Sequence, residues 1–282
     1  MQAFDTNSKN IFALEVPVEI TENYSCILKA YWGSALKSPL QLFCDAQKKA
    51  LELGAEFISL YFNSNEPSTE LKPSYISKYK NLLQDVLKVC KMPLMVKLSS
   101  HSAWDIELAQ ALFSVVDRDI IISPIQAANY KEIIEIATKS NFNHKFVMRT
   151  PIDINLTKEL NILSIDEGVS ENQILIDPDM GCIGYGIDYG YSIIERICLA
   201  RISGDKMLDM PIIVYAGEES YRAKETKSSD FPSSWGDLES RAKMWEISTA
   251  SSLIAAGANI VVCWHPEVIK VLKSSFCEAV CH

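Results

Sequence analysis

The sequence lacks an excess of basic residues. Its 282 residues include 27 Lys and Arg against 36 Asp and Glu, so the formal net charge at pH 7 is −9. Proteins that bind nucleic acids need clustered Lys and Arg to neutralise phosphate groups. This composition therefore argues against a nucleic-acid-binding protein, and we expect no such partner.

The sequence also lacks long apolar runs. Its longest apolar stretches, such as Ile120–Ile122 and Pro211–Ala216, are far shorter than the ~20 residues with which a helix crosses a bilayer. The segment from Met1 to Thr6 has neither the basic start nor the apolar run of a signal peptide. We therefore expect a cytoplasmic protein that does not contact a membrane.

Metal-binding patterns are missing as well. The four histidines are scattered and do not lie at metal-ligand spacing from acids or thiols. Cys277 and Cys281 lie one helical turn apart before His282, but an iron–sulfur cluster needs four thiolates. We expect no metal ion and no iron–sulfur cluster in this chain. The eight cysteines, expected to be free and mostly buried thiols in a reducing cytosol, are Cys26, Cys44, Cys90, Cys182, Cys198, Cys263, Cys277 and Cys281.

Signs of a dinucleotide-binding fold or of a second domain are also lacking. No GxGxxG turn follows the first apolar segment. No linker, low-complexity tract or charge run divides the chain. The length is close to the ~250 residues typical of one TIM-type barrel. We therefore expect one domain spanning residues 1–282.

What the sequence does contain is a regular alternation of short apolar segments and amphipathic segments. The apolar segments predict strands at Ile11–Val18, Glu56–Phe62, Pro93–Leu98, Asp119–Ser123, Lys145–Arg149, Gln173–Ile176, Pro211–Tyr215 and Asn259–Cys263. The amphipathic segments predict helices at Pro39–Leu53, Ser74–Cys90, Ala103–Val116, Ala128–Ser140, Tyr191–Ile202, Ser240–Ala256 and Pro266–Phe276. Continuous apolar strands are typical of parallel sheets covered by helices on both faces. The alternation therefore predicts an α/β fold, a single (β/α)₈ TIM-type barrel.

In such a barrel the functional residues lie in the loops at the carboxyl ends of the strands. The most informative loop follows the sixth predicted strand and reads Asp177-Pro178-Asp179-Met180-Gly181-Cys182-Ile183-Gly184-Tyr185-Gly186-Ile187-Asp188-Tyr189. Its three glycines allow the backbone to approach a planar or bulky ligand without obstruction by a Cβ atom. A tight turn that needs positive φ angles is the alternative interpretation. For Asp177, hydrogen bonding to a ligand and capping of the turn remain equally open.

The motifs around this loop form a recognisable set. They are Asn129–Lys131, Thr150–Asn155, Ser192, Glu195-Arg196, Gly204–Leu208, Met210-Pro211, Tyr221–Glu225, Trp235-Gly236, Trp245-Glu246 and His265–Glu267. With these motifs in this order, the chain resembles the small (delta) subunit of the corrinoid iron–sulfur protein in the acetyl-CoA decarbonylase/synthase complex of archaea. The resemblance is dense from Asn129 to Val271.

The sequence departs from the family pattern in several places. The first half matches by the rhythm of its strands rather than by motif, and the longer N-terminal segment of the family is expected to be absent. Ser123–Gln126 stand where the family has Asn-Ala-Glu-Gln, Cys182 replaces a glycine, and Trp264 replaces a basic residue. Because these changes lie in loops at the top of the barrel, contacts with the cofactor or a partner are the ones expected to have changed.

The resemblance implies a TIM barrel that serves as the small subunit of a corrinoid iron–sulfur methyl carrier in the reductive acetyl-CoA (Wood–Ljungdahl) pathway. In that role the chain helps to hold a corrinoid that carries a methyl group from methyl-tetrahydropterin to acetyl-CoA synthase. The corrinoid is shared with a large corrinoid iron–sulfur subunit, which carries the iron–sulfur cluster and forms a heterodimer with this chain. The other implied partners are a methyl-tetrahydropterin methyltransferase and acetyl-CoA synthase/CO dehydrogenase.

The expected role is non-catalytic, because the chemistry of methyl transfer belongs to the cofactor. Residues expected to contact the corrinoid are Asn155, Asp177, Gly181, Gly184, Tyr185, Gly186, Asp188 and His265. Structural interpretations stand beside these. Asp153 is expected to cap a helix that begins near Leu156, and a structural hydrogen bond is the commoner role for a histidine such as His265.

Two other functions remain open. The chain could be a stand-alone methyltetrahydrofolate-dependent methyltransferase that binds the pterin through Asp153, Asn155 and Asp177. It could also be a divergent structural partner subunit that has lost contact with the cofactor. Pterin binding by the isolated chain would favour the first of these.

Overall fold

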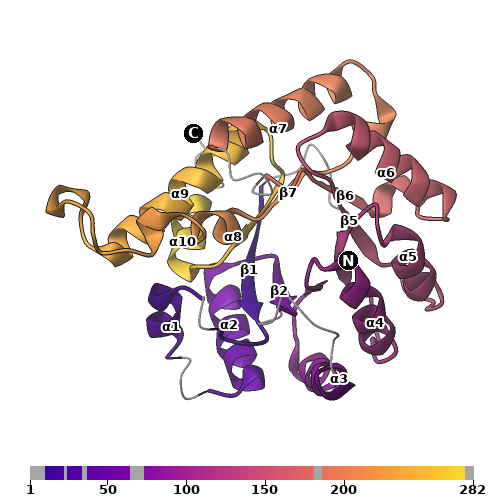
Figure 1. Cartoon of the computed structure of the whole chain (residues 1–282), viewed down its shortest axis with the longest axis horizontal. Coiled ribbons are helices and arrows are strands. Elements are labelled where there is room, and N and C mark those ends of the chain that lie inside the picture. Colours follow the sequence, from indigo (N-terminus) through magenta and orange to yellow (C-terminus); the bar gives the residue numbers. More distant parts are fainter. Residues whose placement is uncertain (1–9, 22–23, 34–36, 64–72, 181–185, 277–282) are drawn as a thin grey trace.

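The structure is a computed structural model that describes residues 10–21, 24–33, 37–63, 73–180 and 186–276. Its centre is an eight-stranded parallel sheet with helices arranged around it (Figure 1). The strands are β1 (Ile11–Pro17), β2 (Phe57–Tyr61), β3 (Leu94–Lys97), β4 (Ile121–Ile125), β5 (Lys145–Arg149), β6 (Ile174–Asp177), β7 (Ile213–Val214) and β8 (Ile260–Cys263). Their order in the sheet is β6-β5-β4-β3-β2-β1-β8-β7.

The ring of strands closes between β6 and β7. β7 has two residues, and its link to β6 is a single parallel bridge between Ile176 and Ile212. The N–H of Ile176 donates a hydrogen bond of 2.8 Å to the carbonyl of Pro211 at the same place. The strands thus form a nearly closed (β/α)₈ barrel, which confirms the fold class predicted from the sequence. None of the helices in the described ranges is both long and apolar enough to cross a membrane.

The helices follow the strands and cover the outside of the barrel (Figure 1). They are α1 (Cys26–Trp32), α2 (Pro39–Leu53), α3 (Pro73–Val89), α4 (Ser102–Phe113), α5 (Tyr130–Thr138), α6 (Ile154–Asp166), α7 (Ile187–Ile202), α8 (Ala216–Ser220), α9 (Leu238–Ala256) and α10 (Pro266–Phe276). The seven predicted helices all occur, with ends shifted by a few residues at most. Of the other three, α6 was expected only through its start near Leu156, and α1 and α8 were not predicted, because helices this short show little periodicity.

The start of α6 shows how local side chains set helix boundaries. Asp153 precedes the helix, and its side chain accepts hydrogen bonds from the N–H groups of Asn155 at 2.7 Å and Leu156 at 3.1 Å. This satisfies two of the N–H groups that a helix end leaves without partners. The capping role predicted for Asp153 is therefore confirmed.

We expect the substitution Asp153→Ala to lower the free energy of unfolding by about 1 kcal/mol, the usual value of such a cap. Asp153→Asn retains the capping oxygen and should stay within a few tenths of a kcal/mol of the wild type. Urea denaturation of the three proteins measures this difference. Equal midpoints for the alanine variant and the wild type would refute a stabilising cap.

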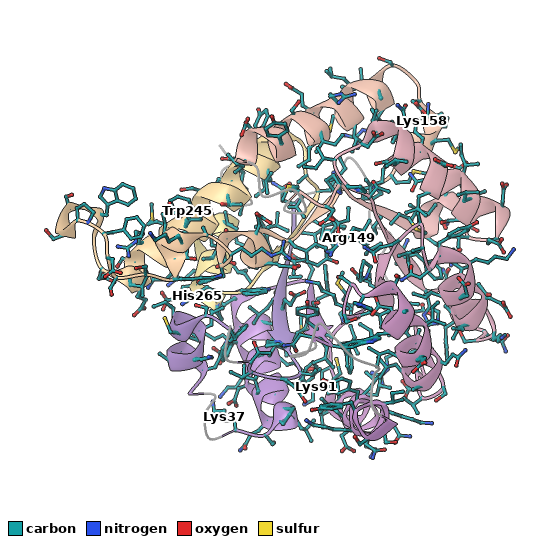
Figure 2. The ribbon with its side chains drawn as sticks, in the orientation of Figure 1. Lys37, Lys91, Arg149, Lys158, Trp245 and His265 are labelled. Atoms are coloured by element: carbon teal, nitrogen blue, oxygen red, sulfur yellow. The ribbon has the colours of Figure 1, made fainter. Side chains whose placement is uncertain are left out.

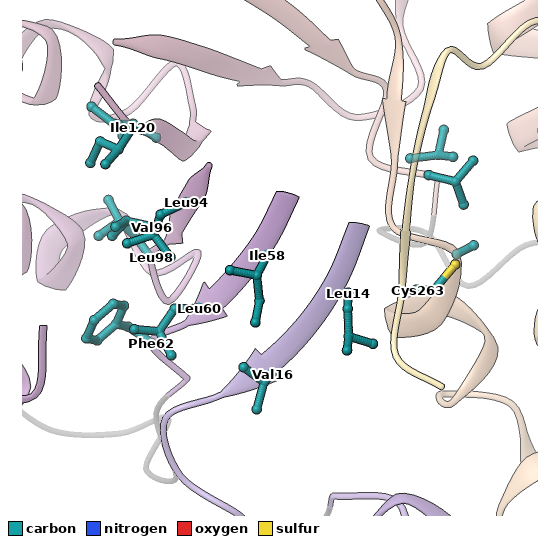
Figure 3. Close-up of a cluster of buried hydrophobic side chains, with 14 of the residues drawn as sticks. Leu14, Val16, Ile58, Leu60, Phe62, Leu94, Val96, Leu98, Ile120 and Cys263 are labelled. Atoms are coloured by element: carbon teal, nitrogen blue, oxygen red, sulfur yellow. The ribbon is translucent and has the colours of Figure 1, made fainter. Parts of the chain in front are cut away.

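The core consists of two layers, because successive residues of a strand point to opposite faces. The outer layer lies between strands and helices and includes Leu14, Val16 and Ile58 (Figure 3). The inner layer fills the barrel, and its members are Ala13, Phe57, Met95, Ile121, Val147, Leu175, Ile213, Tyr215, Ile260 and Val262. The interior is therefore a packed core rather than a channel.

Candidate functional site

The inward-facing side chains change character at the carboxyl ends of the strands. Below that level they are mostly the apolar residues of the inner layer. Above it lies a set that we call the mouth layer, consisting of Glu15, Ser59, Tyr61, Lys97, Ser123, Arg149, Asp177 and Trp264, joined by Glu218 from α8. Tyr215 of the inner layer reaches up to this set and contacts Lys97 and Arg149. Because TIM barrels carry their functional residues at this end, the mouth layer is the candidate functional site.

Lys97 is fully buried in the mouth layer. Its Nζ atom lies 2.9 Å from Oε1 of Glu15 and 2.6 Å from Oε2 of Glu218. It also lies 4.2 Å from the ring centroids of both Tyr61 and Tyr215. Burial alone would lower the pKa of Lys97, but the two carboxylates outweigh burial and raise it. Lys97 therefore stays positively charged and is unsuited to act as a nucleophile or a base.

Glu15 is fixed by two further donors. Trp264 donates its Nε1–H to Oε1 of Glu15 at 2.8 Å, and the hydroxyl of Ser59 donates to Oε2 at 2.9 Å. Trp264 in turn lies against Gly217 of α8, where a Cβ atom would be 2.4 Å from the backbone nitrogen of Trp264. Only glycine permits this approach, so α8 packs directly against the residue that follows β8.

Glu218 joins the centre of the mouth to its rim. Besides Lys97, its carboxylate contacts Arg222, whose Nη2 atom lies 2.5 Å from Oε1 of Glu218. Burial raises the pKa of Glu218, but Lys97, Arg149 and Arg222 outweigh burial and hold that pKa at about 2. Glu218 is therefore a permanent anion between cations.

Arg149 and Asp177 form a second buried ion pair, with 2.5 Å between Nε and Oδ2. The guanidinium group also lies 4.9 Å from the ring centroid of Tyr215. The other oxygen of Asp177 accepts the N–H of Asp179 at 2.9 Å and so fixes the turn after β6. Asp179 has a φ of 43°, and burial together with the charge of Asp177 raises its pKa to about 6. The capping interpretation of Asp177 thus has a geometric basis, whereas hydrogen bonding of Asp177 to a ligand stays a prediction.

Glu246 of α9 fixes the position of Trp264 through hydrogen bonds to the backbone. Its Oε1 atom accepts the N–H of Trp264 at 2.7 Å, and Oε2 accepts the N–H of His265 at 3.2 Å. Burial raises the pKa of Glu246 to about 8 despite these two hydrogen bonds, which favour the charged form. This carboxyl therefore holds the backbone that positions Trp264.

Free space at the mouth is small in the middle and larger at its sides. Among Arg149, Asp177 and Glu218 the cavity volume is about 20 Å³, which is room for about one water molecule. A hollow of about 290 Å³ lies on the side of Glu15 and Trp264. A third cavity, of about 550 Å³, lies between α7, α8 and α9. Among the described residues, the middle of the mouth is thus filled by its own side chains, and these hollows lie at its edges.

Three of the residues predicted to contact a cofactor lie between the end of β6 and the first turn of α7. Asp177 is buried in the mouth layer, as described above. Gly186 precedes α7 and lines the 550 Å³ cavity, and Asp188 lies exposed in the first turn of that helix. Gly181, Gly184 and Tyr185 of the same loop lie outside the described residues.

The other two predicted contacts lie elsewhere. Asn155 is exposed in the first turn of α6 and does not belong to the buried mouth layer. His265 is fully buried; its Nδ1 atom accepts the N–H of Glu267 at 3.2 Å, and its ring packs against Tyr31. In Figure 2 His265 lies well away from Arg149. His265 thus makes the structural hydrogen bond that is usual for such a residue.

Sequence reasoning missed the charged residues that dominate the mouth. Glu15, Lys97 and Arg149 each follow an inward-facing apolar residue by two positions, at or near the end of a buried strand. A charge at such a position faces the barrel interior and needs a partner. This spacing in the sequence could have indicated that Glu15, Lys97 and Arg149 face the barrel interior. For Glu218, which lies in a short helix that was not predicted, the sequence shows no comparable pattern.

Metal-ligand clusters and disulfides are absent from the part of the chain that the structure describes. No group of three or more His, Cys, Asp and Glu residues there is arranged to hold a metal ion. The described cysteines, Cys26, Cys44, Cys90, Cys198 and Cys263, are free thiols. The described side chains at the mouth offer paired charges and hydrogen bonds, which suit binding and orientation.

Comparison with known sequences gives a consistent set of relatives. The family model described as CO dehydrogenase/acetyl-CoA synthase delta subunit matches residues 34–263. The acetyl-CoA decarbonylase/synthase complex subunit delta of Archaeoglobus fulgidus is 29% identical over 272 residues, covering 93% of this chain and 58% of the relative. Subunit delta 2 of the same complex from Methanosarcina acetivorans is 30% identical over 236 residues, covering 81% and 53%. The chain thus spans a little over half the length of these curated relatives.

Comparison with solved structures finds the same barrel in dihydropteroate synthases. The dihydropteroate synthase of Xanthomonas albilineans superposes with a TM-score of 0.63 at 12% identity, covering 98% of this chain and 94% of that one. The dihydropteroate synthase of Thermus thermophilus gives 0.63 at 11% identity, covering 98% and 96%. At this level of identity the likeness concerns the fold alone.

Proposed function

Because this chain belongs to the CO dehydrogenase/acetyl-CoA synthase delta subunit family, we propose that its barrel mouth faces the corrinoid of a methyl-carrier protein. In this proposal the chain is the smaller of two subunits and covers the cofactor, while the larger subunit carries the iron–sulfur cluster. The proposal takes the reductive acetyl-CoA pathway as its setting and the cytoplasm as its location. Its support comes from the family and from the geometry of the mouth layer.

The observation that carries the proposal is the closed centre of the mouth. Lys97 pairs with Glu15 and Glu218, and Arg149 pairs with Asp177. The cavity among Arg149, Asp177 and Glu218 has a volume of about 20 Å³. A ligand therefore cannot enter the barrel centre without breaking buried ion pairs, which is strongly unfavourable. A broad, flat cofactor that lies across the mouth avoids this penalty. A compact heterocycle that must enter the barrel would have to break these buried ion pairs.

The start of α7 suits the edge of a large ring that carries amide side chains. Gly186 caps α7 without a side-chain hydrogen bond to the first N–H groups of the helix, which leaves donors for carbonyl oxygens. Beside them, Asp188 offers a carboxylate acceptor, and its Oδ1 atom would lie 2.5 Å from a Cβ atom at position 186. Gly186 and Asp188 are thus the described residues that would hold the corrinoid, with Asn155 as a contact at the periphery.

The remaining predicted contacts enter the proposal differently. Gly181, Gly184 and Tyr185 lie outside the described residues, and their contact with the cofactor is proposed from the sequence alone. Asp177 acts indirectly, because it holds Arg149 and the turn that leads into this loop. His265 is fully buried, so it supports the turn after β8 rather than contacting the cofactor.

When bound, the corrinoid supplies the cobalt that accepts a methyl group from a methyl-tetrahydropterin and yields it to acetyl-CoA synthase. The chain's own residues contribute binding, orientation and exclusion of water. The charges of Lys97, Arg149 and Arg222 are each matched by a carboxylate, so these pairs present no net charge to the cofactor. The partners in this proposal are the large corrinoid iron–sulfur subunit, a methyl-tetrahydropterin methyltransferase and acetyl-CoA synthase/CO dehydrogenase.

The test is to produce the chain alone and together with the large corrinoid iron–sulfur subunit, and to measure the corrinoid absorption spectrum. We expect stoichiometric corrinoid in the two-subunit protein and none in the isolated chain. The variant Gly186→Trp should lower the corrinoid content of the two-subunit protein at least tenfold, because the indole obstructs the start of α7. Ser203→Trp, an exposed position at the far end of the same helix, is the matched control.

Other results would favour the alternatives. Tight binding of a methyl-tetrahydropterin by the isolated chain, with methyl transfer to free cobalamin, would make it a stand-alone methyltransferase. Unchanged corrinoid content in Gly186→Trp would point to a structural subunit that does not contact the cofactor.

A further inference from the structure

One cavity lies outside the barrel, on its α7–α9 side. It has a volume of about 550 Å³, with Met180, Ile187 and Trp245 on its walls and Gly190 and Ser248 in its lining. A second hollow of about 220 Å³ shares Trp245 and Ser248 with it and continues along α9 to Trp235. We call the two together the α7–α9 groove. In Figure 2 Trp245 lies on α9, well away from Arg149 at the barrel centre.

Large apolar side chains are exposed along this groove. The exposed fraction is 45% for Ile187, 37% for Trp245, 59% for Met244 and 51% for Trp235. All four line one or other of the two hollows. Single exposed apolar residues are ordinary, but a gathered set with hollows beneath it is typical of an interaction surface. Trp and Met are also enriched at the centres of protein interfaces.

The extent of this surface favours a polypeptide over a small molecule. A small ligand is buried within one pocket by most of its surface. Such a ligand in the larger cavity would leave Trp235 and Met244 in water. An amphipathic helix laid along α9 would cover both hollows, as occurs when an apolar helix face enters a groove.

The groove is continuous with the barrel mouth. Met180, Glu219 and Arg222 line both the small cavity at the mouth and the 550 Å³ cavity. A subunit that covers the mouth therefore reaches the inner end of the groove as well. The inference that follows thus rests on the function proposed above.

Arg222, at the inner end of the groove, indicates which polar group the bound polypeptide should carry there. The Arg222 side chain is 52% exposed, and its Nη1 atom lies 3.6 Å from Glu219, a longer contact than the 2.5 Å between Nη2 and Glu218. A guanidinium group has five N–H donors, so Arg222 can donate a hydrogen bond to one more acceptor from outside. A carboxylate complements this position, whereas the outer end of the groove is apolar.

We propose that the α7–α9 groove receives an amphipathic helix of the large corrinoid subunit, with apolar side chains against Ile187 and Trp245 and a carboxylate at Arg222. The groove and the mouth then form one continuous interface. The cofactor lies over the mouth, and the protein contact that fixes the two subunits lies beside it.

The experiment measures the dissociation constant between this chain and the large corrinoid subunit for the wild type, Trp245→Glu and Leu199→Glu. Leu199 is 57% exposed on the same helix pair but does not line the groove, so it controls for a charge placed on an apolar surface position. We expect Trp245→Glu to weaken binding by about 30-fold or more, as for an interface hot spot, and Leu199→Glu to bind like the wild type. Thermal unfolding of each chain verifies that the variants fold.

Each result has a defined meaning when the corrinoid spectrum of the mixed subunits is recorded as well. Wild-type affinity and normal corrinoid content in Trp245→Glu would overturn the groove as the docking site while leaving the proposed function intact. Equal weakening by both substitutions would also overturn it, since the effect would not belong to the groove. If the wild-type chain does not bind the large subunit at all, the proposed function and this inference both fall.

Discussion

Replacing Lys97 by methionine is expected to lower the free energy of unfolding by about 3–5 kcal/mol. Methionine fills nearly the same space, so the loss is that of the charge. Without the ammonium group, Glu15 stays buried and loses its cation, and Glu218 keeps its ion pair with the half-exposed Arg222. An uncompensated buried charge is much less favourable than one left in water. Urea denaturation of the variant and the wild type measures the difference.

A matched control is Lys88→Met, because Lys88 forms its ion pair with Asp85 on the surface of α3. Surface pairs contribute little, so this variant should differ from the wild type by less than about 1 kcal/mol. The deficit of Lys97→Met should also shrink at low pH. In the folded wild type the pKa of Glu218 is about 2, below its usual 4.5, so this carboxylate stabilises the fold above pH 4.5 and stops doing so as the pH falls toward 2. A deficit below 1 kcal/mol at pH 7 would show that water compensates these carboxylates and that the mouth is not closed.

A second large effect is expected from pH, through Glu246. In the folded protein the pKa of Glu246 is about 8, whereas its usual value is 4.5. Between these values the folded state keeps a proton that the unfolded chain has released, so stability is highest below pH 4.5, falls as the pH rises and levels off above pH 8. The whole change amounts to about 2–5 kcal/mol. Glu246→Gln, which resembles the protonated carboxyl, should lack it.

The measurement is the free energy of unfolding from pH 5 to 9 for both proteins, because their difference isolates Glu246 from other titrating groups. Glu195→Gln, at an exposed position on α7, serves as the control and should follow the wild type. Parallel curves for the wild type and Glu246→Gln would contradict the raised pKa. Since Glu246 holds the backbone of Trp264, fluorescence of Trp264 is a second probe of the same titration.

The fold was largely predictable from the sequence, for a physical reason. Strands buried on both faces are apolar along most of their length, and this pattern is visible without any knowledge of neighbours. The exceptions are elements too short to have a period, such as α8, and boundaries set by pairing. β7, for instance, was predicted at Pro211–Tyr215 but its ladder includes only Ile213 and Val214. The ends of such a strand depend on its hydrogen bonds to neighbouring strands, and these cannot be read from the sequence.

The candidate site was predictable only in part. Motif order identified the loop after β6, and the structure describes Asp177, Gly186 and Asp188 of that loop. The pairing of Lys97 with Glu15 and Glu218 joins residues 82 and 121 positions apart. Such pairing depends on the register of a closed barrel, in which Tyr61 lies beside Lys97 and Arg149 beside Asp177. The spacing of Glu15, Lys97 and Arg149 within apolar strands was a signal that they are buried, but the partner of each follows only from the three-dimensional structure.

The single bridge between Ile176 and Ile212 has a mechanical consequence. The other neighbouring strands share ladders of two or more paired residues, so the barrel wall has its weakest joint between β6 and β7. Local opening of a protein begins where backbone pairing is sparse. The loop after β6 and helix α8 after β7 emerge on the two sides of this joint. A partner molecule that binds to both would connect β6 to β7. Binding of such a partner would therefore stabilise the barrel at the strand pair that opens most easily.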